Sequence, residues 1–129
     1  MFVDASALVA MLFVEPEAGA LAERLEAAGG GLTSPLALFE AAAALMRRPR
    51  TRVQADIELD ELLREANIAV TSITPEIGRL ALEAFERYGK GRGHPAQLNM
   101  GDCFSYACAQ SLAVPLLYKG DDFARTDLA

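Results

Sequence analysis

The stretch Leu98–Ser111, LNMGDCFSYACAQS, combines the start of a helix with a single carboxylate among small and apolar residues. Its pattern predicts Asn99 as the N-cap and Asp102 as the third residue of that helix. Free backbone N–H groups and the positive end of the helix dipole favour an ionised acid at this position. Asp102 is therefore a candidate cation ligand, although a role as a helix cap alone would also explain it.

Around this helix, short apolar stretches alternate with helix patterns along the chain. We expect strands at 2–4, 32–34, 68–71 and 115–118. Helices are expected at 5–13, 35–46 and 75–88, and two further helices begin after residue 17 and after residue 51. Successive parallel strands need crossover connections, which the helices between them supply. The sequence thus predicts a three-layer α/β/α domain with a central parallel sheet of four to five short strands. A fifth strand, at the end of the chain, would be very short or missing.

The length of 129 residues indicates one domain, covering residues 1–129. Although 52% of the residues are hydrophobic, no apolar run approaches the roughly 18 residues that a membrane span requires. The start, Met1–Asp4, lacks the basic region and long apolar segment of a secretory signal. We therefore expect a cytoplasmic protein without membrane association. Cys103 and Cys108 lie on different faces of one predicted helix, which indicates packing rather than a disulfide or zinc site.

The formal net charge of −6 argues against a protein that binds nucleic acid through a broad basic surface. Basic residues nevertheless gather in two places, namely Arg47, Arg48, Arg50 and Arg52 after one helix, and Lys90, Arg92 and His94 in a glycine-rich loop. This loop does not match the phosphate-binding pattern G-x-x-x-x-G-K-[ST]. Either cluster could contact phosphate, and a solvated turn or bonds to the acids of a partner would explain both equally well.

Asp4 is expected at the carboxyl end of the first strand, immediately before a helix. In open parallel sheets ligands bind at this edge, because loops and helix N-termini converge there. Ser6 follows two residues later and could hydrogen-bond to the Asp4 carboxylate, cap the helix, or do both.

Glu40 is the only charged residue between Leu36 and Met46, in a helix that is otherwise apolar. Its spacing from Leu36 and Ala43 directs the carboxylate into an apolar stripe. Burial of an ionised carboxylate without a partner costs several kcal/mol, so an arginine, a proton or a cation must compensate it. A buried salt bridge and a metal site both satisfy this condition.

The predicted fold can bring four acidic positions together: Asp4, Glu40, Asp102 and the Asp121-Asp122 pair after the last strand. Crowded carboxylates repel one another and raise one another's pKa unless positive charge is held among them. Oxygen ligands without a matching histidine or cysteine set favour Mg²⁺ or Mn²⁺. Because magnesium keeps several waters and accepts phosphate oxygens, phosphoryl chemistry is expected. Catalysis by a histidine pair is excluded, since His94 is the only histidine, and the serine-hydrolase pattern G-x-S-x-G is absent.

At these residues the chain resembles the PIN domain family, and most closely the VapC-type ribonuclease toxins of prokaryotic toxin–antitoxin pairs. The resemblance covers nearly the whole chain and is carried by Val3–Ala7, Glu40, Tyr88–Gly91, Leu98–Cys103 and Gly120–Phe123. It implies an RNA endonuclease that uses Mg²⁺, with Mn²⁺ as a possible substitute. It also implies a VapB-like antitoxin, a segment of which covers the acidic site, and a homodimer.

The resemblance identifies Asp4, Glu40 and Asp102 as the first three acids of the site. The closing G-x-D-F pattern favours Asp122 as the fourth, and Asp121 is close enough to share the role. We expect Asp4 and Asp102 to be the primary metal ligands, while Glu40 and Asp122 complete the shell through water or orient the nucleophile. The expected substrate contacts are Ser6, Lys90 and Arg92.

Three other functions are alternatives for this sequence. An α/β phosphatase would use Asp4 as a covalent nucleophile, but such phosphatases have a second aspartate two residues later, where this chain has Ser6. A degenerate nuclease fold would only bind RNA or an antitoxin, and the intact acids argue against it. A nuclease of the same fold could instead process DNA or structured RNA.

Overall fold

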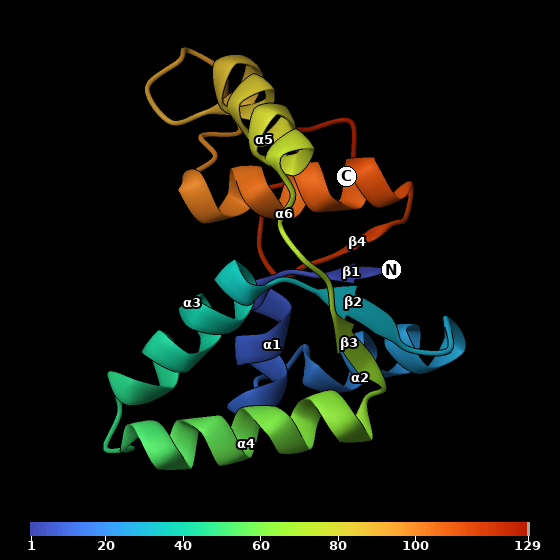
Figure 1. Cartoon of the computed structure of the whole chain (residues 1–129), viewed down its shortest axis with the longest axis vertical. Helices are drawn as coiled ribbons and strands as arrows, with labels where there is room; N and C mark the ends of the chain where they lie inside the picture. Colours follow the sequence, from blue (N-terminus) through green and yellow to red (C-terminus); the bar gives the residue numbers. More distant parts are fainter. Residues whose placement is uncertain (129) are drawn as a thin grey trace.

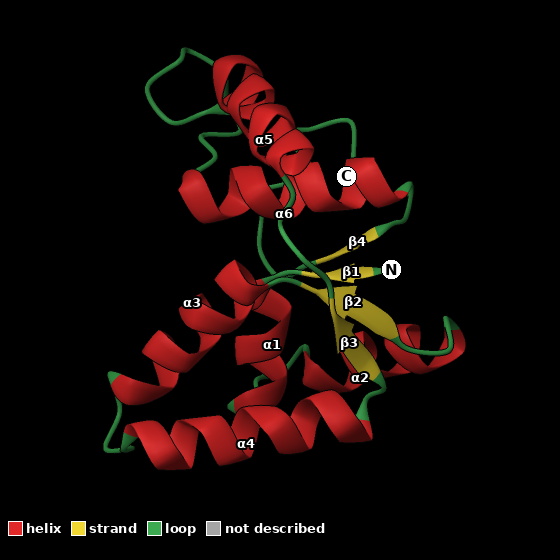
Figure 2. Ribbon diagram, viewed as in Figure 1, coloured by secondary structure: helices red, strands yellow, loops and turns green. Residues whose placement is uncertain are grey.

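The computed structural model describes residues 1–128 of the chain. Within them, one sheet contains β1 (Phe2–Val3), β2 (Gly31–Thr33), β3 (Ile68–Val70) and β4 (Leu116–Leu117). The helices are α1 (Ala5–Leu12), α2 (Ala18–Ala27), α3 (Pro35–Met46), α4 (Arg52–Glu65), α5 (Pro75–Tyr88) and α6 (Met100–Leu112) (Figure 2). The sheet order is β3-β2-β1-β4 and all three strand pairings are parallel.

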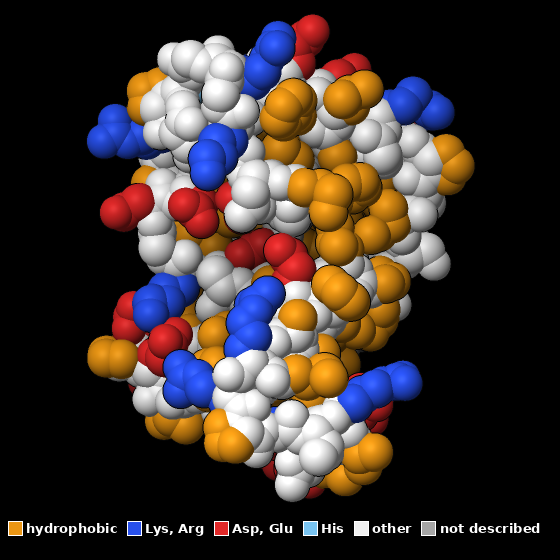
Figure 3. All heavy atoms as spheres, turned by 90° about the vertical axis from the view of Figure 1, so that its left-hand side faces the viewer, with side chains coloured by type: hydrophobic (Ala, Val, Ile, Leu, Met, Phe, Trp, Pro, Cys, Tyr) orange, Lys and Arg blue, Asp and Glu red, His pale blue; other side chains and the backbone are white. Residues whose placement is uncertain are grey.

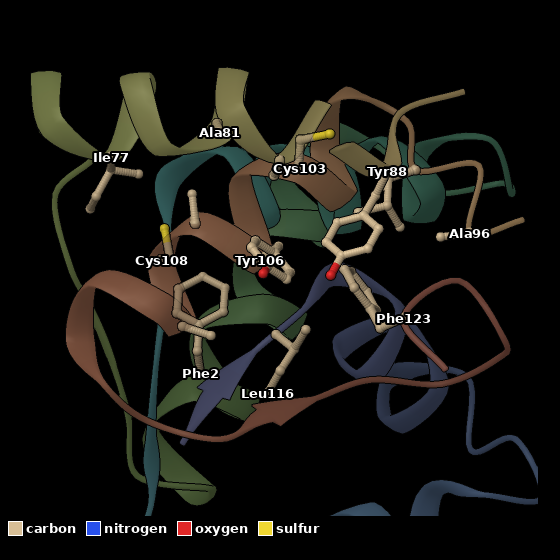
Figure 4. Close-up of a cluster of buried hydrophobic side chains, with 14 residues drawn as sticks. Phe2, Ile77, Ala81, Tyr88, Ala96, Cys103, Tyr106, Cys108, Leu116 and Phe123 are labelled. Carbon is tan, nitrogen blue, oxygen red and sulfur yellow. The ribbon is translucent and has the colours of Figure 1, made fainter. Parts of the chain in front are cut away.

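Helices cover both faces of the sheet, with α1 to α4 on one side and α5 and α6 on the other (Figure 1). Neighbouring residues of a strand point to opposite faces, so β1 contributes one side chain to each of two cores. Phe2 packs in the core beneath α5 and α6, while Val3 packs in the core with α1 and α3. Figure 4 shows the first core, where Phe2 and Leu116 of the strands lie near Tyr106 and Cys108 of α6. The predicted three-layer fold with a parallel sheet is confirmed.

Capping residues set the starts of three helices, and one of them, Ser34, was expected at the end of the strand 32–34 instead. The side chains of Ser34, Thr74 and Asn99 each accept a hydrogen bond from the backbone N–H three residues later. The observed α3 and α5 match the expected ranges 35–46 and 75–88. Three of the four strands are shorter than expected, and β1 ends at Val3 because Asp4 is already the N-cap of α1. The strand β2 has the expected three residues but ends at Thr33, because Ser34 is the N-cap of α3.

The end of the described chain contains turns rather than a fifth strand. After β4, residues 121–128 form turns and bends within the part of the chain that the structure covers. The buried side chain of Phe123 anchors this segment, with its ring centroid 5.1 Å from that of Tyr118. Of the predicted four to five strands, the described residues therefore form four.

Both cysteines lie in α6 and are buried without a disulfide partner. Burial raises the pKa of each thiol to about 11, and the charge of Asp102 contributes to this shift at Cys103. Both thiols therefore stay protonated at neutral pH, in agreement with the predicted packing role. None of the helices within residues 1–128 has the length and apolar composition needed to cross a membrane.

Candidate active site

Asp4 lies at the junction between β1 and α1, where its carboxylate is held from both sides. Its Oδ2 accepts hydrogen bonds from the Ser6 backbone N–H, at 2.9 Å, and from Ser6 Oγ, at 2.6 Å. Its Oδ1 accepts one from Ser105 Oγ at 2.5 Å. The Asp4 residue is only 4% exposed. Asp4, and not Ser6, is therefore the N-cap of α1. Of the two roles that the sequence left open for Ser6, the bond to the Asp4 carboxylate is confirmed, while the role as helix cap is wrong because Ser6 lies inside the first turn of α1 and acts as the donor.

Asp102 is the third residue of α6 and forms a reciprocal capping box with Asn99. The Asp102 N–H donates to Asn99 Oδ1 at 2.9 Å, and the Asn99 N–H donates to Asp102 Oδ2 at 3.1 Å. The predicted N-cap and helix position are therefore confirmed. Since the Asp102 residue is also only 8% exposed, its charge is largely removed from solvent.

The pKa of Asp102 is raised to about 7, mainly by burial, while the hydrogen bond from Asn99 opposes the rise. Three neighbouring carboxylates, Asp4, Asp122 and Glu40, contribute to this rise through their negative charges. These four acids come from the end of β1, from α3, from α6 and from the turn after β4. The structure thus brings Asp4, Glu40, Asp102 and Asp122 within electrostatic reach of one another.

Glu40 is half-buried in α3 and points towards the start of α6. Burial raises its pKa, and the nearby charge of Asp4 raises it further. A Cβ atom at Gly101 would clash with both carboxylate oxygens of Glu40, so the missing side chain of Gly101 makes room for this acid. Glu40 forms none of the ion pairs found within residues 1–128. The described chain therefore does not support the alternative of a buried salt bridge for Glu40.

The two aspartates after β4 differ in their relation to the other acids. Both are exposed, but it is the charge of Asp122 that raises the pKa of Asp102. The backbone carbonyl of Asp121 accepts a hydrogen bond from Ala124 within the turn. This arrangement favours Asp122 over Asp121 as the fourth acid.

Lys119 is the basic residue that follows β4, and it forms ion pairs with acids outside the carboxylate group of the site. Its Nζ lies 3.0 Å from Glu15 Oε1 and 3.3 Å from Glu17 Oε2, in the segment between α1 and α2. Its backbone N–H donates to Ser6 Oγ at 3.0 Å. The backbone of Lys119 therefore helps to hold Ser6 beside Asp4, while its ammonium group neutralises Glu15 and Glu17.

The glycine-rich loop joins α5 to the start of α6. A parallel bridge between Gly89 and Leu98 closes it, and both Lys90 and Arg92 are exposed. On the face shown in Figure 3, acidic side chains gather at mid-height with Lys and Arg side chains above and below them. A polyanion that reached the acids would therefore meet basic groups on either side.

The acids fit a hard divalent cation in donor type and charge. No group of three or more His, Cys, Asp or Glu side chains within residues 1–128 is arranged to hold a metal ion directly. Mg²⁺ keeps several waters in its shell and is commonly held by only one or two carboxylates, so it does not require such a group. The carboxylate oxygens of Asp4 and Asp102 are of the type that Mg²⁺ and Mn²⁺ prefer.

Ser105 and Gly101 are the two site residues that the sequence reasoning missed. Ser105 lies three residues after Asp102, a spacing that puts both on one face of a helix. That spacing is the signal that could have identified Ser105. Gly101 carries no such signal, since its importance depends on how closely α3 approaches α6.

Comparisons with known proteins identify the family of this chain. A model of the PIN domain family matches residues 1–128. The VapC ribonuclease R02377 of Rhizobium meliloti is 44% identical, and the match covers 98% of each chain. The ribonuclease VapC42 of Mycobacterium tuberculosis is 41% identical over 99% of this chain and 96% of its own.

The fold also has a solved counterpart. The crystal structure of VapC20 of Mycobacterium tuberculosis, a toxin that cleaves the sarcin-ricin loop, superposes with a TM-score of 0.70. That match covers 95% of this chain and 92% of the other, at 21% sequence identity. The family match over residues 1–128 and the two relatives at 44% and 41% identity show that the chain belongs to the PIN domain family, among the VapC ribonucleases.

Proposed function

We propose that this chain is a metal-dependent endoribonuclease and the toxin of a VapB–VapC-type toxin–antitoxin pair. The observation that carries the proposal is the group of four carboxylates, Asp4, Glu40, Asp102 and Asp122, none of which forms an ion pair within residues 1–128. The charges of the other three raise the pKa of Asp102. The full-length VapC relatives support the reaction class. We further propose that residues 1–129 form a single PIN domain, and that it acts in the cytoplasm on RNA.

Asp4 and Asp102 would hold Mg²⁺, or Mn²⁺ in its place, with Glu40 and Asp122 acting through water. The bound cation would lower the pKa of a water molecule and stabilise the departing oxygen of the phosphodiester. Ser6 holds the Asp4 carboxylate in place, and Asn99 does the same for Asp102. Glu40 can accept a hydrogen bond from the attacking water and so orient it.

Contacts to the RNA backbone are proposed for Lys90 and Arg92. Both are exposed in the loop that leads into α6, and basic side chains of this kind bind phosphate without reading sequence. Ser6 is a weaker candidate for a direct contact, because its Oγ already donates to Asp4 and accepts from the Lys119 N–H. Its contribution is then to hold Asp4 while RNA is bound.

The proposed activity is tested by incubating the purified protein with total RNA in Mg²⁺, in Mn²⁺ and in a chelator. We expect discrete cuts with either ion and none with the chelator, because the carboxylates alone cannot activate water. Cleavage that persists in the chelator would contradict the metal dependence. A phosphorylated enzyme intermediate would instead support Asp4 as a nucleophile. A neighbouring small reading frame whose product blocks cleavage would distinguish a toxin from a processing nuclease.

The proposed homodimer and antitoxin contact are supported by apolar side chains on the surface. Leu82, Phe85 and Met100 are 69%, 39% and 65% exposed and line a groove of about 440 Å³ between α5 and α6. Figure 3 shows a band of hydrophobic side chains beside the acidic group. Such exposed apolar surface is typical of protein interfaces. A VapB-like antitoxin would then cover the neighbouring acids with basic residues.

The dimer is tested by placing a charge in this groove. Leu82→Glu is expected to shift the protein from dimer to monomer in sedimentation experiments, because a buried unpaired carboxylate disfavours the interface. The matched control is Val53→Glu on α4, where the original side chain is 67% exposed but lies outside the groove. A dimer that tolerates Leu82→Glu as well as Val53→Glu would exclude this groove as the interface.

A further inference from the structure

Ser105 joins two parts of the site that are far apart in the sequence. It lies in α6 one turn after Asp102, is 2% exposed, and donates its hydroxyl to Asp4 Oδ1 at 2.5 Å. The residues are separated by 101 positions, and Asp4 lies at the junction of β1 and α1. The bond therefore connects the carboxylate at the end of β1 to the helix that carries the second primary acid.

The direction of this bond is informative. A serine within a helix commonly satisfies its hydroxyl by donating to a backbone carbonyl of the preceding turn. Ser105 instead donates to a carboxylate, and a hydrogen bond to an ionised acceptor is roughly twice as strong as one between neutral groups. The contact is thus specific for the Asp4 side chain rather than a local helix bond.

Together, Ser105 and Ser6 restrict the rotation of the Asp4 carboxylate. The terminal torsion of aspartate is broad when the group is free. Here Ser105 donates to Oδ1 and Ser6 donates to Oδ2, so each oxygen has a fixed hydroxyl neighbour. Each carboxylate oxygen can accept more than one bond, which leaves both of them able to bind a further cation or water.

We propose that Ser105 is a positioning residue that fixes the Asp4 carboxylate relative to Asp102 and thereby sets the affinity of the site for a divalent cation. This inference rests on the proposed metal-dependent function. Ser105 and Asp102 belong to one rigid helix, so a bond from Ser105 defines where Asp4 lies with respect to Asp102. Ser105 itself contacts neither the reacting phosphate nor the attacking water in this proposal.

The test measures Mn²⁺ binding by its effect on thermal unfolding, together with the Mn²⁺ dependence of RNA cleavage. Partners that orient metal ligands typically contribute 10–100-fold to metal affinity. Ser105→Ala is expected to raise the Mn²⁺ concentration for half-maximal stabilisation and cleavage by roughly tenfold or more. The cleavage rate at saturating Mn²⁺ should change much less, because Ser105 does not touch the substrate.

Two further variants isolate the hydroxyl group. Ser105→Thr keeps a donor at this position and is expected to restore most of the Mn²⁺ affinity, provided that its circular dichroism and thermal unfolding remain native. Ser111→Ala, on the exposed face of the same helix, is the matched control and should bind Mn²⁺ like the wild type. Since alanine adds no atoms, a loss in Ser105→Ala cannot result from overpacking.

The outcomes are distinct. Equal Mn²⁺ affinities for the wild type and Ser105→Ala would overturn the inference. So would a natively folded Ser105→Thr protein whose Mn²⁺ affinity is as low as that of Ser105→Ala. A tenfold loss in Ser105→Ala that Ser105→Thr reverses would support it. If the wild type binds Mn²⁺ with this pattern but cuts no RNA, the positioning role stands while the proposed ribonuclease function fails.

Discussion

Replacement of Asp102 by asparagine is expected to reduce RNA cleavage by at least roughly a hundredfold while the fold is preserved. Asparagine has nearly the same size and can still accept the bond from the Asn99 N–H, so the start of α6 should remain capped. What the variant loses is the negative charge of a proposed primary ligand. The measurement is the initial rate of cleavage with Mg²⁺ and with Mn²⁺.

The same variant is expected to be more stable than the wild type when metal is removed. Burial and the neighbouring acids raise the pKa of Asp102 from 3.8 to about 7. Between these values the folded protein binds more protons than the unfolded chain, so its stability falls as the pH rises. The asparagine side chain of the variant does not titrate, and at pH 8 in a chelator we expect a gain of roughly 1–3 kcal/mol.

The control for Asp102→Asn is Asp60→Asn, which removes an exposed aspartate of α4. This variant should cleave RNA like the wild type and show the wild-type dependence of stability on pH. Full activity of Asp102→Asn would remove Asp102 from the site. Equal stability of the wild type and Asp102→Asn at pH 8 in the chelator would mean that the carboxylates do not repel one another as inferred.

Gly101→Ala is expected to reduce RNA cleavage by roughly tenfold to a hundredfold with little change in stability. The added Cβ would clash with both carboxylate oxygens of Glu40, so the carboxylate must move away. A glutamate side chain is flexible, so this displacement should change the free energy of unfolding only slightly. The displaced carboxylate can no longer orient the attacking water, so the cleavage rate should fall.

Gly19→Ala is the matched control, because Gly19 lies in α2, outside the groove between α5 and α6, and a Cβ there would meet no atom within 4 Å. Alanine should stabilise this helix by about 0.5–1 kcal/mol and leave cleavage unchanged. Thermal unfolding and cleavage rates of both variants separate the two effects. Unchanged cleavage by Gly101→Ala would show that Glu40 can move without cost and does not orient the nucleophile.

Helix starts and the general architecture could be derived from the sequence because the signals are local. The expected ranges 35–46 and 75–88 begin at the observed helix starts, Pro35 and Pro75. Asn99 likewise placed Asp102 at the third position of α6, and the alternation of strands and helices predicted a parallel sheet. A cap involves residues within one turn, so its energy hardly depends on the rest of the fold.

The sequence by itself therefore determined the layers, the helix boundaries and the acids Asp4, Glu40 and Asp102 as candidates. Only the tertiary structure decided how these acids are held. The bond from Ser105 to Asp4 joins residues 101 positions apart, and the contact between Gly101 and Glu40 requires α3 to approach α6. Such contacts follow from the packing of whole elements across the sheet, which no short sequence pattern encodes.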